Sequence, residues 1–252
     1  MATVEPAASL QDSAHRYARA LIVPSKLLAL HPRQAGGVGD AAALAPAITL
    51  GVISAFEGFM EDFFATALRL KGLTLAQIAK RVDINNPGID DLEKLAKREF
   101  PGISSKIGVG FSVTIWSPPA IGIRQFDATV ADWQRAKKDG KGWMQVRHNL
   151  SHGITSGWKS EVWPGPLKEN EHSVPASSVL KPMNSGKHSL VLHGAITCAR
   201  IYQAAGQHLA NCVAEHMGEA LSWSRSPDFP MYKKSYAEYL AENGSDRSSD
   251  RQ

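Results

Sequence analysis

Apolar residues recur every three or four positions along residues 42 to 71, and no other feature of the chain constrains its fold as strongly. This spacing places them on one face of an α-helix. The face consists of Leu44, Ile48, Val52, Phe56, Phe59, Phe63, Ala67 and Leu70. Gly72 follows at a position where glycine commonly ends a helix. The pattern therefore predicts one long helix with a broad apolar face.

A second long helix is predicted over residues 186 to 217. Its apolar stripe contains several small residues, which permit close helix packing, and runs through Leu190, Ala195, Ala199, Tyr202, Ala205 or Gly206, Leu209, Val213 and Met217. Shorter helices are expected at 9–21, 72–84, 89–100, 126–138 and 143–152. Asp127 is a candidate N-cap for the fourth of these. The fold class predicted is an all-α helical bundle with two long core helices and shorter connecting helices.

Glycine, proline and serine mark the predicted breaks between these helices. Residues 101–125 are expected to be loop with a short extended piece at 111–116, and the sequence DGKG, 139–142, is expected to separate two helices. Residues 153–186 are predicted to form a long surface loop. The domain prediction is an N-terminal lead-in at 1–40, made partly flexible by QAGGVGD, a helical domain at 41–222, and a C-terminal tail at 223–252 with a disordered end.

The composition indicates a cytoplasmic protein. Hydrophobic residues make up 43% of the 252, which is enough for a proper core. Cys198 and Cys212 fall on one predicted helix, roughly 21 Å apart, which is too far for a disulfide and suits a reducing compartment. We read no signal peptide at the N-terminus. The most apolar window, 41–56, is short and contains Pro46 and Gly51, so no membrane span is predicted.

The stretch VRHNLSHG, residues 146–153, carries the chemistry. Arg147 forks onto phosphate oxygens, and His152 has a side chain that titrates near neutrality, so the two suit phosphodiester chemistry without a metal. Five residues separate them by about 140° around a helix, so they do not share one face. Further hydrogen-bonding groups are His148, Asn149 and Ser151. The alternative is structural: basic residues favour the end of a helix dipole, and Gly153 caps it.

Positive charge accumulates around this stretch. Six basic residues and two acids lie between 132 and 159, with Trp133, Trp143 and Trp158 interleaved. The lysines that we expect to bind nucleic acid are Lys137, Lys138, Lys141 and Lys159. Basic residues beside aromatic rings are typical of surfaces that bind single-stranded nucleic acid. A solvated charged face over core tryptophans is the alternative.

Two acids on the first long helix form a like-charge pair at i and i+4. Glu57 and Glu61 are mildly unfavourable together and are expected to face water. The alternative is that they pair with Arg147 or orient an imidazole from across the bundle. They are therefore kept as supporting site residues.

Other classes of function have weaker support in the sequence. The nine histidines show no HExxH or cysteine-pair spacing, and His148 with His152 gives only two ligands, so no metal or other cofactor is expected. No G-x-S-x-G elbow of a serine hydrolase is present. LTLAQIAKRVDI, 73–84, reads like the first helix of a DNA-binding helix-turn-helix. The helix that follows has acids at 90, 91 and 93, which would face phosphates badly.

These motifs resemble the HEPN superfamily, in particular its RiboL-PSP type. RHNLSH fits the Arg-x4-His signature, with a polar residue after the arginine and a glycine after the histidine. ISAFEGFMEDFF, 53–64, resembles the first core helix of that family. NNPGIDDLEKLAKREFPGI, 85–103, resembles its Asn-Pro segment and short helix, and residues 186–217 resemble its closing helix. The resemblance covers about residues 42 to 220.

The resemblance implies both a fold and an activity. It implies an α-helical bundle that forms a homodimer, with paired motifs lining a cleft at the interface. Many members are metal-independent endoribonucleases of toxin–antitoxin, abortive-infection or other defence systems, which implies RNA and a cognate antitoxin or other regulatory protein as partners. His152 would act as base or acid and Arg147 would stabilise the phosphorane, giving a 2′,3′-cyclic phosphate and a 5′-OH. Inactive members imply the alternative of a partner- or RNA-binding module without catalysis.

Overall fold

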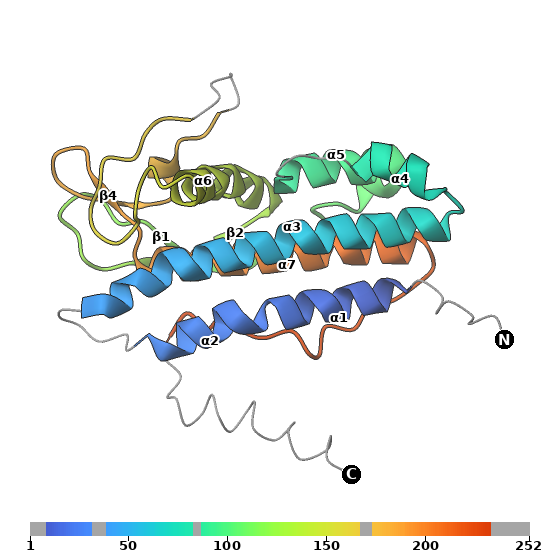
Figure 1. Cartoon of the computed structure of the whole chain (residues 1–252), viewed down its shortest axis with the longest axis horizontal. Coiled ribbons are helices and arrows are strands. Elements are labelled where there is room, and N and C mark those ends of the chain that lie inside the picture. Colours follow the sequence, from blue (N-terminus) through green and yellow to red (C-terminus); the bar gives the residue numbers. More distant parts are fainter. Residues whose placement is uncertain (1–8, 32–38, 83–86, 167–172, 233–252) are drawn as a thin grey trace, which may run out of the picture.

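Two long helices run side by side through the middle of the molecule (Figure 1). The computed structural model describes residues 9–31, 39–82, 87–166 and 173–232. The long helices are α3, Leu44–Leu70, and α7, Leu192–His216. Shorter helices and two small hairpins surround them, so the predicted all-α bundle with two long core helices is confirmed.

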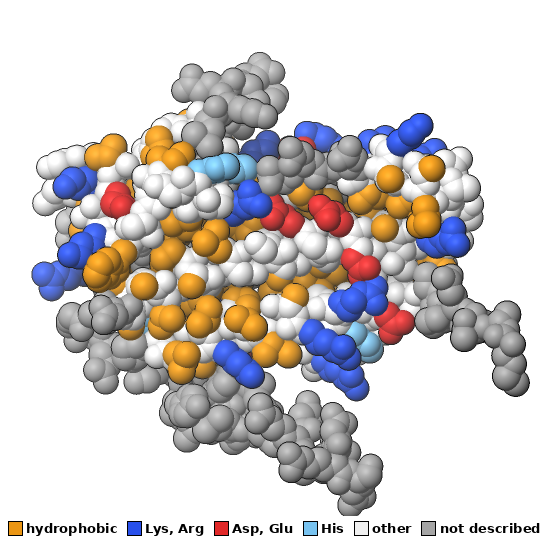
Figure 2. All heavy atoms as spheres, in the orientation of Figure 1, with side chains coloured by type: hydrophobic (Ala, Val, Ile, Leu, Met, Phe, Trp, Pro, Cys, Tyr) orange, Lys and Arg blue, Asp and Glu red, His pale blue; other side chains and the backbone are white. Residues whose placement is uncertain are grey.

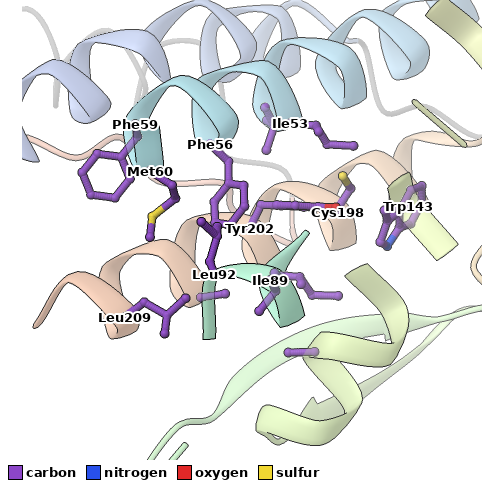
Figure 3. Close-up of a cluster of buried hydrophobic side chains, with 14 of the residues drawn as sticks. Ile53, Phe56, Phe59, Met60, Ile89, Leu92, Trp143, Cys198, Tyr202 and Leu209 are labelled. Carbon is purple, nitrogen blue, oxygen red and sulfur yellow. The ribbon is translucent and has the colours of Figure 1, made fainter. Parts of the chain in front are cut away.

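The core forms where α3 and α7 meet. The rings of Phe56 and Tyr202 pack edge to face with centroids 4.8 Å apart, and both side chains are fully buried. Figure 3 shows them among buried apolar side chains from several helices. Gly206 lies against the same ring, because a Cβ there would stand 3.3 Å from Phe56. The small residues of α7 therefore let the two long helices approach closely, as their sequence predicted.

The N-terminal segment also packs along α3 (Figure 1). It contains α1, Leu10–Ala20, and α2, Ile22–Leu30. Ser9 caps α1 by accepting a hydrogen bond from the Asp12 amide, and the Tyr17 ring stacks on Phe59 at 4.2 Å. Residues 9–30 of the expected lead-in thus belong to the bundle, and α2 was not predicted. Most of the expected flexible joint, 34–40, lies outside the described residues.

The chain after α7 returns along α1 and α2. The Trp223 ring meets Tyr17 edge to face, Ser25 donates to the Asp228 carbonyl, and Phe229 is fully buried. The packed part of the molecule therefore extends past the predicted boundary at 222. Residues 233–252, where a disordered end was predicted, lie outside the described residues.

Short elements form the side of the bundle that carries α6, Trp133–Ser151. They include α4, Leu75–Val82, and α5, Ile89–Glu99, both close to their predicted ranges, with residues 83–86 between them not described. The 3₁₀ turns are Gly39–Ala43, Ile103–Ser105 and Ala176–Ser178. The long predicted loop also holds β3, Lys181–Pro182, while 167–172 is not described. Its partner strand β4, His188–Ser189, falls where the second long helix was predicted to begin, so the predicted start at 186 is wrong and α7 begins at Leu192.

An antiparallel hairpin precedes α6. Its strands are β1, Val113–Ser117, where an extended piece was expected, and β2, Asp127–Ala131. The prediction of a helix from 126 is therefore wrong over its first residues. Asp127 lies in β2, and the helix begins after Asp132, whose side chain accepts a hydrogen bond from the Arg135 amide at 2.8 Å. Thr197 of α7 pairs with the Trp116 backbone and anchors the hairpin.

Helix α6 runs without interruption from Trp133 to Ser151, so the predicted break at DGKG is wrong. Gly140 and Gly142 are buried inside this helix. A Cβ at Gly140 would stand 2.9 Å from the Ile89 side chain, and one at Gly142 would stand 2.8 Å from Val179. These glycines therefore permit close packing of neighbouring elements rather than ending a helix.

One described helical stretch, Ala41–Leu70, is long and apolar enough to cross a membrane by length and composition alone. Of its most apolar window, 61% is buried inside the protein. Burial of this kind is what a core helix shows, and the apolar length alone decides nothing about a membrane.

Candidate functional site

Arg147 reaches from α6 to the middle of α3. Its Nη2 donates a hydrogen bond to Glu57 Oε2 at 3.2 Å. The two side chains are 21% and 12% exposed, so the pair is largely shielded from water yet still open on one side. Of the two expectations for Glu57, pairing with Arg147 is the one found. This is the guanidinium's only hydrogen bond to another residue of the described chain, which leaves other N–H groups for a ligand.

The Glu57 carboxyl is held in an environment that disfavours its charge. Burial raises its pKa above the usual range, Arg147 works in the opposite direction, and Glu61 adds a smaller upward contribution. Its second oxygen, Oε1, is buried without a hydrogen-bond partner among the described residues. Glu57 thus has one oxygen that fixes the guanidinium and one that is unpaired. Glu61 itself is exposed, as expected.

His152 follows the last residue of α6 and is exposed to solvent. Its amide donates to the His148 carbonyl at 3.1 Å, and its ring lies near parallel to that of His148 with centroids 6.3 Å apart. Gly153 then takes a left-handed conformation with φ of 66°, and the Ile154 amide bonds back to the Asn149 carbonyl at 2.9 Å. The helix therefore ends at the glycine as the sequence predicted. That ending leaves the imidazole open to solvent.

Asn149 is fully buried, and neither atom of its amide group has a hydrogen-bond partner in the described chain. The amide of neighbouring Thr155 approaches the Asn149 carbonyl at 3.3 Å. The Thr155 hydroxyl is also buried without a hydrogen-bond partner in the described chain. Ser151, by contrast, donates its hydroxyl to the His148 carbonyl within the helix. Unpaired buried polar groups are costly, so the end of α6 is not optimised for stability alone.

Tyr202 belongs to this neighbourhood, although no sequence motif pointed to it. Burial raises the pKa of its hydroxyl, and the charges of Glu57 and Arg147 also influence that pKa. The hydroxyl donates to the Gly140 carbonyl at 3.0 Å. Tyr202 thus ties α7 to α6. Only its position on the apolar stripe was visible from the sequence.

Two of the predicted RNA-binding lysines are paired with acids of α5. Lys137 Nζ lies 2.7 Å from Glu93, and its side chain is 15% exposed. Lys141 Nζ lies 3.0 Å from Asp90. Glu93 also accepts from the indole of Trp133 at 2.9 Å. Acids of α5 therefore face α6, and these two lysines are partly neutralised.

The remaining predicted lysines are exposed. Lys138 lies on the outer face of α6, and Lys159 lies beyond the helix end with its Nζ 5.1 Å from the ring centroid of Trp158. Trp133 and Trp143 are core residues, whereas Trp158 is exposed. The basic stretch thus combines the two predicted arrangements. Part of it is a charged face over buried tryptophans, and part is one exposed lysine–tryptophan pair.

Figure 2 shows how these side chains meet at the surface. Histidine, basic and acidic side chains lie next to one another where α6 passes α3. Of the site residues from these two helices, Arg147 and Glu57 form an ion pair, and Glu61 is exposed. No group of three or more histidines, cysteines or acids that could hold a metal ion occurs in the described part of the chain.

Comparison with protein-family models, with curated proteins and with solved structures finds no match for this chain. The candidate site is therefore defined by its own geometry. It consists of a guanidinium anchored on a largely buried carboxylate, and an exposed imidazole at the end of the same helix.

Proposed function

We propose that this protein is a metal-independent endoribonuclease of the HEPN type, with Arg147 and His152 as its catalytic residues. The observation that carries the proposal is the arrangement at the end of α6. Glu57 fixes the Arg147 guanidinium through one N–H, and the same helix end exposes His152. An anchored guanidinium suits the stabilisation of a phosphate that gains charge, and an exposed imidazole at the end of the same helix suits proton transfer.

The reaction is attack of a ribose 2′-OH on the adjacent phosphate. The bond from the 2′-oxygen to phosphorus forms as the bond to the 5′-oxygen breaks, giving a 2′,3′-cyclic phosphate and a 5′-OH. One group must take the proton of the 2′-OH, and another must give a proton to the leaving oxygen. His152 supplies one of these groups, and Arg147 stabilises the phosphorane.

A second acid–base group is needed, and a homodimer supplies it. In this proposal two copies bring two His152 imidazoles to one cleft, as the resemblance implies. Exposed apolar side chains on α2 support a contact between copies, because Ile22, Val23 and Leu30 are all exposed. Figure 2 shows hydrophobic side chains gathered over α2 and the N-terminal half of α3. Light scattering on the purified protein measures the oligomeric state directly.

The proposed setting is the cytoplasm, as a toxin or defence effector controlled by a cognate antitoxin or other regulatory protein. The thiols of Cys198 and Cys212 support a reducing compartment, because both are free and buried. The resemblance of the Arg-x4-His stretch is the support for the defence role. Co-purification of a tagged chain with a neighbouring gene product tests that role separately from the chemistry.

Analysis of RNA products in EDTA tests the activity. The purified protein is incubated with a single-stranded RNA, and the ends of the fragments are examined with phosphatase and kinase. Fragments that resist phosphatase until the cyclic phosphate is opened, and that accept a new 5′-phosphate directly, support the proposal. Fragments with 3′-OH and 5′-phosphate ends, or cleavage that stops when EDTA is added, refute it.

A binding module without catalysis is the second candidate, and one observation favours it. No hydrogen bond joins Arg147 to His152 in the described chain, and Arg147 is already paired with Glu57. Such a module would bind RNA or a partner protein through the same surface without cleaving. RNA that is retained by the protein but recovered intact after prolonged incubation would favour this candidate.

A further inference from the structure

The turn that follows α6 presents one exposed indole ring close to the candidate site. Gly157 lies against the last turn of α6, since a Cβ there would stand 2.8 Å from the Leu150 side chain. Leu150 lies between Arg147 and His152 in the sequence. Trp158 comes next and is 45% exposed, whereas Trp133 and Trp143 are buried. The turn therefore brings an aromatic surface to the same end of the helix.

Glu161 fixes the shape of this turn. Its carboxylate accepts hydrogen bonds from the Ser156 amide at 3.0 Å, the Ser156 hydroxyl at 2.9 Å and the Gly157 amide at 2.9 Å. These bonds hold the pKa of Glu161 below its usual range. The backbone of Glu161 also pairs with His188 through two hydrogen bonds, at 2.9 and 2.8 Å. Trp158 is thus displayed on a preorganised turn.

The charge around the indole favours an anionic ligand. Lys159 Nζ lies 5.1 Å from the ring centroid of Trp158, and Lys159 has no ion-pair partner among the residues described. The only acid of the turn, Glu161, directs its carboxylate to Ser156 and Gly157 and forms no ion pair with Lys159. An aromatic ring beside an unneutralised cation matches a nucleobase beside its phosphate.

We propose that Trp158 and Lys159 form a nucleotide subsite for single-stranded RNA, in which an unpaired base stacks on the indole and the lysine contacts a phosphate. This inference rests on the proposed function for the identity of its ligand. A base inside a duplex has both faces covered by its neighbours and cannot stack on the ring. The subsite therefore makes the protein select unpaired RNA.

The test is a binding measurement that does not depend on cleavage. The probe is a fluorescein-labelled 2′-O-methyl oligouridylate of about 12 nucleotides, a length within the usual range of single-strand sites. It lacks the 2′-OH that the proposed reaction needs. Its affinity is measured by anisotropy and compared with that of a 2′-O-methyl duplex of equal length. The variants are Trp158→Ala, Trp158→Phe, Lys159→Ala and, as a matched control, Val162→Ala, an apolar residue of the same turn that is 67% exposed.

The wild type is expected to prefer the single strand. Trp158→Ala weakens that binding about 5- to 100-fold, the usual effect of losing one stacked base, and Trp158→Phe retains most of it. Lys159→Ala reduces the dependence of affinity on salt by about one phosphate contact. Val162→Ala leaves binding unchanged.

Three results would overturn the subsite. They are equal affinity of wild type and Trp158→Ala for the oligouridylate, equal binding of duplex and single strand, and loss of self-association in both Trp158→Ala and Val162→Ala, which would assign the turn to a protein interface. A protein that cleaves RNA but binds the probe equally well without Trp158 refutes only the subsite. A protein that binds through Trp158 and never cleaves refutes only the proposed activity.

Discussion

Arg147 on α6 and Glu57 on α3 are joined by a hydrogen bond of 3.2 Å between Nη2 and Oε2, across 90 residues of sequence. The carboxylate is more buried than the guanidinium, and its second oxygen is unpaired in the described chain. The pair therefore has two consequences that can be separated. It joins two helices, and it anchors a partly exposed cation on the helix that ends at His152.

The contribution of the pair to stability is tested with two variants, one that removes the positive charge and one that removes both charges. Arg147→Ala leaves the Glu57 carboxyl buried without its cation and is expected to lower the free energy of unfolding by on the order of 2 kcal/mol, less than for a fully buried pair. Arg147→Met combined with Glu57→Leu removes both charges and is expected to return within about 1 kcal/mol of wild type. Urea denaturation measures both. Equal instability of the two proteins would show that the pair is not what Arg147 contributes to the fold.

The sequence predicted the long helices because their information is local. The apolar spacing from Leu44 to Leu70 is a property of neighbouring turns, and so is the glycine that ends α6 at Gly153. The pairing of Glu57 with Arg147 remained one of several alternatives, since it depends on how α3 and α6 cross. Nothing within either helix specifies that crossing.

The two wrong predictions, the break at 139–142 and the N-cap at Asp127, also have their causes in contacts between distant segments. Gly140 and Gly142 have low helix propensity, and the sequence alone favours a break there. Ile89 and Val179 come from distant segments and pack closely against these glycines, and the helix continues through them. Asp127 is a good N-cap by type, but pairing with β1 places it in a strand, and Asp132 becomes the cap.

Helix propensity alone predicts that replacing a glycine of α6 by alanine stabilises the protein. At the buried Gly142 we expect the opposite change in stability. Gly142→Ala places a Cβ 2.8 Å from Val179 and is expected to destabilise the protein by about 1–3 kcal/mol. Gly58→Ala is the matched control, because Gly58 is exposed on α3 and its Cβ would meet nothing within 4 Å. That change is expected to stabilise by about 0.5–1 kcal/mol. Thermal melting compares them, and stabilisation by both would contradict the packing role of Gly142.

We predict that the Asn149 side chain supports function while lowering the stability of the fold. Its buried amide lacks partners in the described chain, so Asn149→Leu, a change of similar volume, is expected to stabilise the protein by about 1–3 kcal/mol. If the amide supports the site, RNA cleavage falls in the same variant. Chemical denaturation beside an activity assay measures both properties. A destabilised Asn149→Leu protein would mean that the amide is satisfied in solution.

His208 predicts how stability depends on pH. Its Nε2 accepts a hydrogen bond from the Gly108 amide at 2.8 Å, which requires the neutral ring, and burial lowers its pKa while Glu215 opposes that shift. The contribution is therefore complete above the unfolded pKa, about 6.5, and is lost as pH falls through the lower folded value, by at most about 1.4 kcal/mol per pH unit. Wild type should lose more stability than His208→Gln as the pH falls from about 7.5 to about 5, a range that brackets the unfolded pKa of about 6.5. Parallel pH profiles of the two would contradict this.

The central claim is that the end of α6 is a catalytic site and not only a helix terminus. The most direct measurement is the rate of RNA cleavage in EDTA by wild type, His152→Ala and His216→Ala. His216 is the matched control, since it is an exposed histidine in the last turn of α7 without an arginine partner in the described chain. We expect His152→Ala to reduce the rate by about 10²- to 10⁴-fold and His216→Ala to leave it unchanged, with both proteins folded. An inert wild type, or equal rates for all three, would contradict the claim.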